Sequence, residues 1–143
     1  MRWDVGIDLG TDYVRMAEYR EGAMLEEAAR MAFREGGDMP ICCGDAAARI
    51  DGRACAGVEV CRPMRDGVLE SNFYADRMFR WLFERMDFIS RRKRVGAMIA
   101  CAPFARPVQQ EALMAAAMDA GAGEAALVRA DAAAAIGAGL DLA

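Results

Sequence analysis

The feature that most constrains the fold is an uncharged run of eight residues, Val95–Ala102, in the second half of the chain. A run of this length without alternating polarity is typical of a strand that is covered on both faces of a sheet. Pro103 ends the run, Pro107 is suited to the first turn of a helix, and Ala125–Val128 form a further apolar run. A strand, a helix and a strand in this order predict a crossover with parallel pairing, and hence an α/β fold.

The N-terminal part of the chain predicts antiparallel strands. Strand-forming residues at 3–9 and 13–19 flank a turn at Gly10-Thr11, which is the pattern of a β-hairpin. Residues 23–33 stay ambiguous, because their Ala and Glu content favours a helix while their position suits a third strand. The sequence therefore predicts two or three antiparallel strands before the crossover.

The middle of the chain predicts a small subdomain followed by a long helix. Residues 35–63 are rich in Gly, Ala and Cys, with a short strand expected near residues 41–43 and a helical turn at residues 45–50. The clearest helix is expected at residues 72–87, where apolar side chains recur on one face: Tyr74, Ala75, Met78, Phe79, Leu82, Phe83 and Met86. We interpret this stripe as core rather than as a ligand-binding site.

Composition limits the classes of function. The chain has 143 residues and 55% are hydrophobic, so we expect one folded domain rather than disorder. A net charge of −4 argues against a nucleic-acid-binding protein, and the absence of His excludes metal sites that use it. Five cysteines without a Cys-x-x-Cys pair or an apparent signal peptide favour reduced thiols and a cytoplasmic location. A transmembrane segment is not expected, since no uncharged run approaches about 20 residues.

Residues 5–12 carry the candidate chemistry. A short apolar strand includes the acid Asp8 and runs into the turn Gly10-Thr11-Asp12. Glycine in a turn allows backbone N–H groups to approach a phosphate, and a neighbouring carboxylate can hold Mg²⁺, usually through water. Similar strings also occur in plain β-turns, so both interpretations stay open from these residues alone.

Four stretches of the sequence resemble the MreB family of bacterial actin homologues. They are Gly6–Thr11, which is similar to the first phosphate motif, the string Arg62–Val68, Ala120-Gly121-Ala122, and the helical segment Ala133–Leu140. Together these stretches extend over essentially the whole chain, but they match only the N-terminal half of the family's length.

The resemblance implies the α/β fold of an actin-like ATPase lobe (ribonuclease H-like), with a mixed sheet, flanking helices and a small inserted subdomain. Residues 1–34 and 65–143 would form subdomain IA, and residues 35–64 would form the inserted subdomain IB. In the family, a C-terminal lobe supplies the second phosphate loop and the adenine pocket, and we expect this lobe to be absent. The resemblance thus implies ATP and Mg²⁺ in a weak or incomplete site, with Gly10, Thr11 and Asp12 at the phosphates and Asp8 at the metal.

Two positions depart from the family's pattern. The family carries Glu-Glu-Pro before its Ala-rich helix, and a glutamate there positions the attacking water, whereas this chain has Arg129-Ala130-Asp131. The simplest role for Asp131 is a cap for a helix at residues 132–138. Tyr13 stands where the family prefers a small amide residue. We therefore expect no catalytic residue and negligible nucleotide hydrolysis.

The resemblance implies an MreB-like cytoskeletal protein that acts in cell-shape determination and contacts MreB-like subunits or copies of itself. No nucleic-acid partner is expected, because of the net charge. Two alternatives stay open: an actin-fold ATPase that is active only with a C-terminal half, and a degenerate accessory module that binds a full-length homologue. The sequence could equally be a fragment of a longer gene. An exposed apolar surface is expected where a second lobe would sit.

A cationic segment follows the predicted long helix. It combines two large apolar side chains with four cations: Phe88, Ile89, Arg91, Arg92, Lys93 and Arg94. The pattern predicts a surface loop that contacts anionic lipid at the inner face of the cell membrane, and MreB-like proteins use an apolar loop at this place. The alternative is that the apolar pair packs in the core while the cations are solvated.

Overall fold

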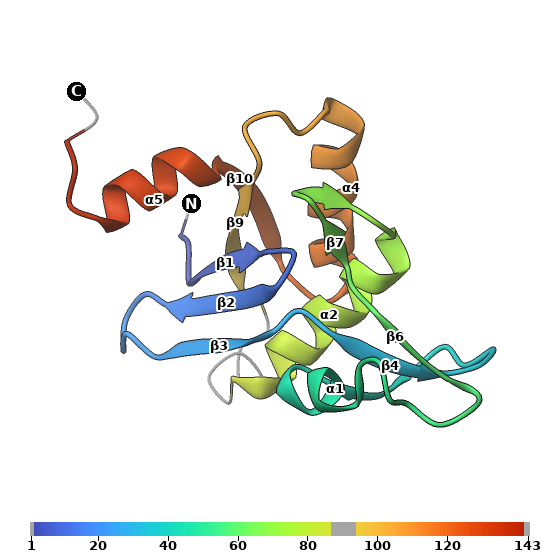
Figure 1. The fold of residues 1–143 in the computed structure, drawn as a ribbon. Coiled ribbons are helices and arrows are strands. Elements are labelled where there is room, and N and C mark those ends of the chain that lie inside the picture. Colours follow the sequence, from blue (N-terminus) through green and yellow to red (C-terminus); the bar gives the residue numbers. More distant parts are fainter. Residues whose placement is uncertain (1, 87–93, 142–143) are drawn as a thin grey trace.

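The computed structural model describes residues 2–86 and 94–141 (Figure 1). The helices are α1 (Asp45–Ile50), α2 (Asn72–Arg85), α4 (Pro107–Asp119) and α5 (Ala130–Gly137). The strands are β1 (Val5–Leu9), β2 (Tyr13–Glu18), β3 (Met24–Ala28), β4 (Met31–Arg34), β5 (Pro40–Cys43), β6 (Val58–Cys61), β7 (Met64–Arg65), β8 (Val68–Leu69), β9 (Gly96–Cys101) and β10 (Glu124–Arg129). The expected α/β fold with a mixed sheet is confirmed.

The large sheet has five strands in the order β10-β9-β1-β2-β3. β1, β2 and β3 pair antiparallel, whereas β9 pairs parallel with both β1 and β10. The predicted hairpin and the predicted crossover through α4 are therefore both confirmed. The ambiguous segment at residues 23–33 forms strands, because β3 pairs with β2 and β4 belongs to a second sheet.

The turn between β1 and β2 requires glycine at its first position. The Gly10 N–H donates to the Tyr13 carbonyl at 3.0 Å, which closes the hairpin. A Cβ atom at residue 10 would lie 2.6 Å from that same carbonyl oxygen, closer than real Cβ contacts come. The turn consequently sets the register in which Asp8 faces Arg15 across the hairpin.

One face of the large sheet forms the core together with α2 and α4 (Figure 1). The strands contribute Val5, Ile7, Leu9, Val14, Met16, Ala97 and Ile99, and the helices contribute Ala75, Met78, Phe79, Leu82, Leu113, Ala116 and Ala117. All of these side chains are buried. The apolar stripe predicted for the long helix is therefore confirmed as core.

The opposite face of the large sheet is less covered than the sequence predicted. Met98 and Ala100 of β9 are half-buried and line a hollow of about 300 Å³, with α5 at its edge through Ala133. The prediction that β9 is covered on both faces is thus wrong for this side, although β9 does lie inside the sheet. The absence of charge in β9 reflects burial on one face and an apolar hollow on the other.

A smaller sheet, in the order β5-β4-β6, lies beside the large one and packs with α1 (Figure 1). The short strand and the helical turn predicted in this region are confirmed as β5 and α1. The central strand β4 ends at Arg34, so this sheet begins before residue 35. The division into subdomains IA and IB remains a prediction.

Candidate functional site

The candidate site lies where three parallel strands end. β1, β9 and β10 run in the same direction, with Asp8 in register with Ala100 and Ala100 in register with Val128. The Gly10–Asp12 turn follows β1, and Arg129 ends β10 at the same edge. In α/β sheets, ligands bind outside the carboxyl ends of parallel strands. The structure therefore brings the predicted phosphate turn and the predicted metal ligand to the edge that this rule favours.

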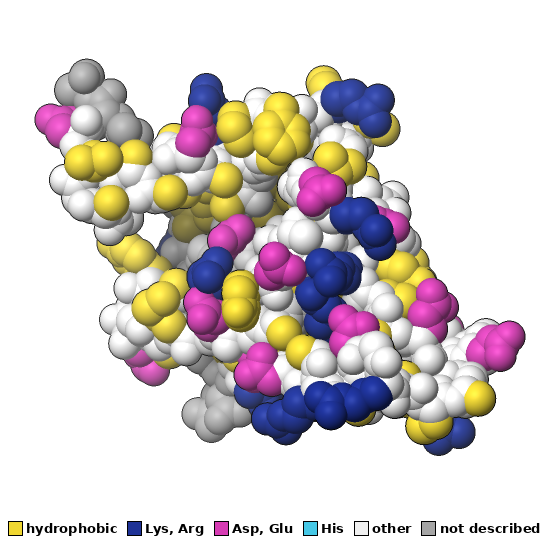
Figure 2. Space-filling view, viewed as in Figure 1, with side chains coloured by type: hydrophobic (Ala, Val, Ile, Leu, Met, Phe, Trp, Pro, Cys, Tyr) yellow, Lys and Arg dark blue, Asp and Glu magenta, His cyan; other side chains and the backbone are white. Residues whose placement is uncertain are grey.

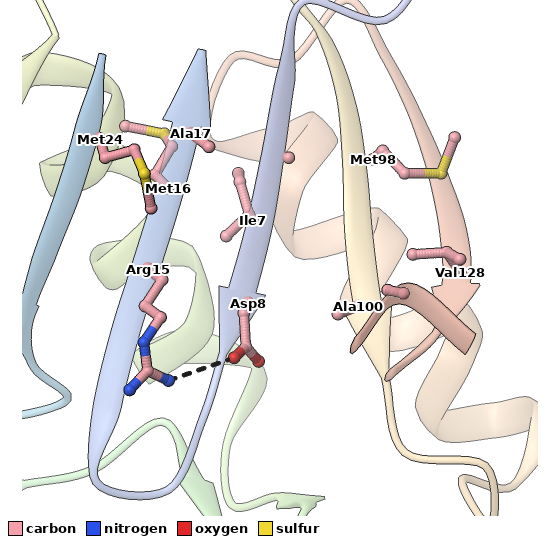
Figure 3. A pocket seen from close by; sticks show the side chains of 11 residues that line it. Ile7, Asp8, Arg15, Met16, Ala17, Met24, Met98, Ala100 and Val128 are labelled. Atoms are coloured by element: carbon pink, nitrogen blue, oxygen red, sulfur yellow. Dashed lines mark hydrogen bonds and ion pairs between the residues drawn. The ribbon is translucent and has the colours of Figure 1, made fainter. Parts of the chain in front are cut away.

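Asp8 is paired with a cation that the sequence reasoning did not identify. Nη1 of Arg15 on β2 lies 3.5 Å from Asp8 Oδ2 (Figure 3). Arg15 Nε also donates to Glu26 of β3 at 2.6 Å. The hydrogen bond to Glu26 is the main reason that the pKa of Arg15 is raised. The hairpin register was the signal that could have found this pair, since residues opposite one another across Gly10–Tyr13 include Asp8 and Arg15.

The donor chemistry at Asp8 fits a water-mediated Mg²⁺ ion. Mg²⁺ is commonly held through one or two carboxylates together with phosphate oxygens, so it does not need a large protein cage. Asp8 has 48% of its side chain exposed, which leaves it accessible. In the part of the chain that the structure describes, no three Cys, Asp or Glu side chains form a metal cluster. A metal here would therefore depend on phosphate as well as on Asp8.

Thr11 is fixed by the string that resembles the family's Arg-Pro-Met motif. That string forms the β7–β8 hairpin, with Asp66 (φ 51°) and Gly67 (φ 75°) in its turn. Positive φ at both central residues is the requirement of the turn type that suits such hairpins, and glycine meets it without strain. The Gly67 N–H donates to Thr11 Oγ1 at 3.3 Å. Two sequence-distant motifs therefore meet at the candidate phosphate turn.

Asp12 is held by two guanidinium groups. Arg30 Nη2 and Arg62 Nη1 donate to Asp12 Oδ1 at 3.4 Å and 3.2 Å. The Asp12 backbone carbonyl also accepts a hydrogen bond from the Ala29 N–H at 2.9 Å. These contacts tie the turn to the segment between the two sheets. Neither arginine was singled out from the sequence as a partner of the turn, because nothing local to the turn indicates them.

Asp131 does not cap the last helix. α5 begins at Ala130, so Asp131 lies inside its first turn, where it accepts two hydrogen bonds from Arg129 at 3.1 Å and 2.6 Å. The cap prediction is wrong because the helix starts two residues earlier than expected. The Arg129 pairing is the main reason that the pKa of Asp131 is lowered. Tyr13, the second position that departs from the family's pattern, is 50% exposed, and Arg15 Cζ lies 5.5 Å from its ring centroid.

The predicted membrane segment is only partly covered by the structure. Phe88, Ile89, Arg91, Arg92 and Lys93 lie outside the described residues. Arg94 is exposed and lines a hollow with Arg2 and Glu124 at the amino end of β9, the edge opposite to the phosphate turn. Among the helices of residues 2–86 and 94–141, none has the length and apolar character needed to span a bilayer.

The hollow beside Asp8 is mainly apolar. Met24, Met98, Ala100 and Val128 line it, and Figure 2 shows hydrophobic atoms at its base, below α5. Asp8 and Arg15 form its polar side (Figure 3). An apolar hollow edged by a charged pair suits contact with another apolar surface better than binding of a highly charged ligand.

Comparison with known proteins shows to which family this arrangement of strands and turns belongs. Residues 2–143 match the family described as MreB/Mbl protein. The cell shape-determining protein MreB of Escherichia coli (strain K12) is 31% identical over 142 residues, covering 96% of this chain and 41% of that protein. The crystal structure of MreB5 of Spiroplasma citri bound to ADP superimposes with a TM-score of 0.85 at 26% identity, covering 96% of this chain and 41% of MreB5. The same protein bound to AMPPNP gives 0.84 at 27% identity, over the same shares of the two chains.

A more distant solved structure, the MamK double helical filament, has a TM-score of 0.66 at 20% identity over 87% of this chain and 40% of that one, which supports the actin-like fold alone. This chain spans about two fifths of the length of the curated relatives it matches. The family match extends over nearly every residue of the chain. The chain therefore belongs to the MreB/Mbl protein family.

Proposed function

We propose that this protein is an MreB-like, actin-family cytoskeletal protein that acts in cell-shape determination and that contacts nucleotide phosphates at the Gly10–Asp12 turn. The observation that carries the proposal is the position of Asp8 and this turn at the carboxyl edge of β1, β9 and β10. Support also comes from the relatives, since the E. coli protein is named for cell-shape determination and MreB5 was crystallised with ADP and with AMPPNP.

The proposed nucleotide site assigns a role to each residue. Backbone N–H groups of the turn and the Thr11 hydroxyl would contact phosphate, and Asp8 would hold Mg²⁺ through water. When bound, Mg²⁺ would neutralise phosphate charge. The side chains of Asp8 and Asp12 are 48% and 67% exposed, so this edge alone would bury little of a ligand. Weak binding is expected, because tight small-molecule sites bury most of their ligand.

Hydrolysis by these residues is proposed to be negligible. Phosphoryl transfer depends on positioning of the attacking water and on charge neutralisation. Asp131 occupies the position closest to the family's water-positioning glutamate, but both of its carboxylate oxygens accept bonds from Arg129. A carboxylate held in this way is poorly suited to orient a water molecule.

The test is a titration of the protein with Mg·ATP followed by amide NMR. We expect shifts at Gly10 and Thr11 with at most millimolar affinity, and we expect Asp8→Asn to remove the Mg²⁺ dependence of those shifts. Glu26→Gln is the matched control, because it removes a carboxylate that also contacts Arg15 but lies on β3, which pairs with β2 and not with β1. Phosphate release clearly above background that is lost in Asp8→Asn would contradict the proposal of negligible hydrolysis.

Self-association is the second proposed property. The observation that favours it is the apolar hollow lined by Met24, Met98 and Ala133 of α5, in which Met24 is 77% exposed. Contiguous apolar surface of this kind commonly marks an interaction site. The accessory-module alternative makes the same prediction for a hetero-complex, so sedimentation of the protein alone and with a full-length homologue distinguishes the two. A protein that stays monomeric at high concentration, both alone and with the homologue, would contradict both self-association and the hetero-complex.

Peripheral membrane contact is the third proposed property. Arg94 lies at the amino edge of β9, so lipid contact there would leave the opposite edge open to nucleotide. Co-sedimentation with anionic vesicles should fall as salt rises, because each cation near an anionic surface contributes about 1 kcal/mol. The double change Phe88→Ser and Ile89→Ser should reduce it further. Equal pelleting with neutral and anionic vesicles would support the core-packing alternative.

A further inference from the structure

We infer that Arg30 and Arg62 form an oxyanion-binding site beside the β1–β2 turn, suited to a phosphate group of a polyphosphate or nucleotide, and that the Asp12 carboxylate occupies this site in the structure. The inference rests on the proposed nucleotide function and adds a regulatory contact to it. Asp12, which the sequence suggested as a phosphate-binding residue, acts here as an internal competitor of the ligand.

The geometry of the three side chains is that of a bound anion. Two guanidinium groups from different parts of the chain converge on one atom, Asp12 Oδ1, at 3.4 Å from Arg30 and 3.2 Å from Arg62. Arg30 lies between β3 and β4, and Arg62 directly follows β6. A planar guanidinium group binds carboxylate and phosphate oxygens in the same way, so a phosphate oxygen fits where the carboxylate oxygen lies.

The two sides of this contact differ in how firmly they are held. Arg30 has only 12% of its side chain exposed, and it also donates to the Thr11 and Ala29 carbonyls at 3.3 Å and 3.2 Å. Its Nε additionally donates to Asp51 at 3.1 Å. Asp12, in contrast, has 67% of its side chain exposed on a turn. A ligand can therefore displace Asp12 into solvent while Arg30 keeps its position.

The charges favour this exchange when the ligand is a phosphate. A phosphate monoester carries between about one and a half and two negative charges at neutral pH, against one for a carboxylate. Thr11 supplies a further donor at the same place, because its Oγ1 accepts the Gly67 N–H and its hydroxyl proton is left to donate. Figure 2 shows cationic and anionic side chains interleaved over this region, which is consistent with paired rather than unopposed charge.

The experiment compares inorganic tripolyphosphate binding by the wild-type chain and by single variants, using calorimetry at low and high salt. Asp12→Asn keeps the size of the side chain and removes its charge, so it should raise the affinity about three- to tenfold, as expected when a competing contact of this strength is removed. Asp51→Asn is the matched control, because Asp51 also pairs with Arg30 but through Nε and away from the turn. It should change the affinity much less.

Arg62→Gln completes the test while leaving Arg30, whose side chain is only 12% exposed, unchanged. In the Asp12→Asn background it should return the affinity to the wild-type value or below, since one of the two guanidinium groups is lost. Equal gains in Asp12→Asn and Asp51→Asn would overturn the inference, because general charge removal would then explain both. Absence of tripolyphosphate binding by Asp12→Asn would also overturn it. Binding of Mg·ATP by the wild type with no gain in Asp12→Asn would leave the proposed function intact and refute this inference alone.

Discussion

The two faces of the large sheet use the same strands for different purposes. On the face toward α2 and α4, alternate residues such as Ile7, Met16 and Ile99 are no more than 2% exposed. On the other face, the residues between them include Asp8, Arg15 and Met98, which line a hollow (Figure 3). Because neighbouring residues of a strand point to opposite faces, stability and the candidate chemistry are separated within each strand.

The two faces of the large sheet therefore tolerate sequence change differently. Substitutions on the helix-covered face remove dispersion contacts from a closely packed core, whereas substitutions on the hollow face act on surface that water or a partner contacts. Matched variants on the two faces should therefore differ in their effect on the free energy of unfolding.

Phe79→Ala should lower the free energy of unfolding by about 3–5 kcal/mol, because it leaves a large cavity in the core. Phe79 is fully buried on α2 and stacks on Phe83 with ring centroids 6.3 Å apart. The matched variant Met24→Ala, on the hollow face, should change it by no more than about 0.5 kcal/mol. Urea denaturation followed by circular dichroism measures both. Similar losses of unfolding free energy in the two variants would contradict the proposed difference between the two faces.

Alkaline pH should destabilise the core through Cys43. Burial raises the pKa of this thiol to about 12, so above pH 9 the unfolded chain loses a proton that the folded chain retains. The free energy of unfolding should therefore fall as pH rises from about 9 to 11, by roughly 1.4 kcal/mol per pH unit from this group.

Cys43→Ala should reduce that pH dependence, while Cys55→Ala, which changes an exposed thiol, should leave it unchanged. Tyr74, whose pKa is raised to about 12 mainly by its hydrogen bond with Cys61, contributes in the same direction in every variant. A pH profile of Cys43→Ala that matches the wild type would show that this thiol is not the cause.

The ion pairs on the hollow face should contribute little to stability. A double-mutant cycle with Arg15→Ala and Glu26→Ala should give a coupling energy of about 0.2–1 kcal/mol, because both groups are about half exposed. The coupling should decrease further in 0.5 M salt. A salt-insensitive coupling above that range would indicate that this face is more buried in solution than in the structure.

Met24→Lys should have the smallest effect on stability, within about 0.5 kcal/mol, because the side chain is 77% exposed. It should nevertheless reduce any self-association measured by sedimentation velocity, since it places a charge in an apolar contact surface. Arg65→Lys, at an exposed ion pair outside the hollow, is the control. If Met24→Lys leaves self-association unchanged, the hollow is not the contact surface.

Much of the fold could be predicted because its signals are local. The Gly10 turn, the apolar run of β9, Pro107 at the start of α4 and the stripe on α2 each depend on nearby residues, and each element is confirmed within a few positions. Local signals failed where two structures suit the same residues, as in residues 23–33. They also failed at Asp131, where the helix begins two residues earlier and Arg129 takes the carboxylate.

The chain's own pattern was thus sufficient for the α/β class, the parallel crossover and the place of the β1–β2 turn, because periodicity, turn chemistry and strand connection are properties of short segments. Tertiary structure alone decided the partners of that turn. Arg62 lies 50 residues from Asp12 and Gly67 lies 56 residues from Thr11 along the chain, and only packing of the segment after β6 and of the β7–β8 hairpin beside the large sheet brings them into hydrogen-bond distance. The electrostatic state of the candidate site therefore depends on long-range packing, which no local pattern in the sequence encodes.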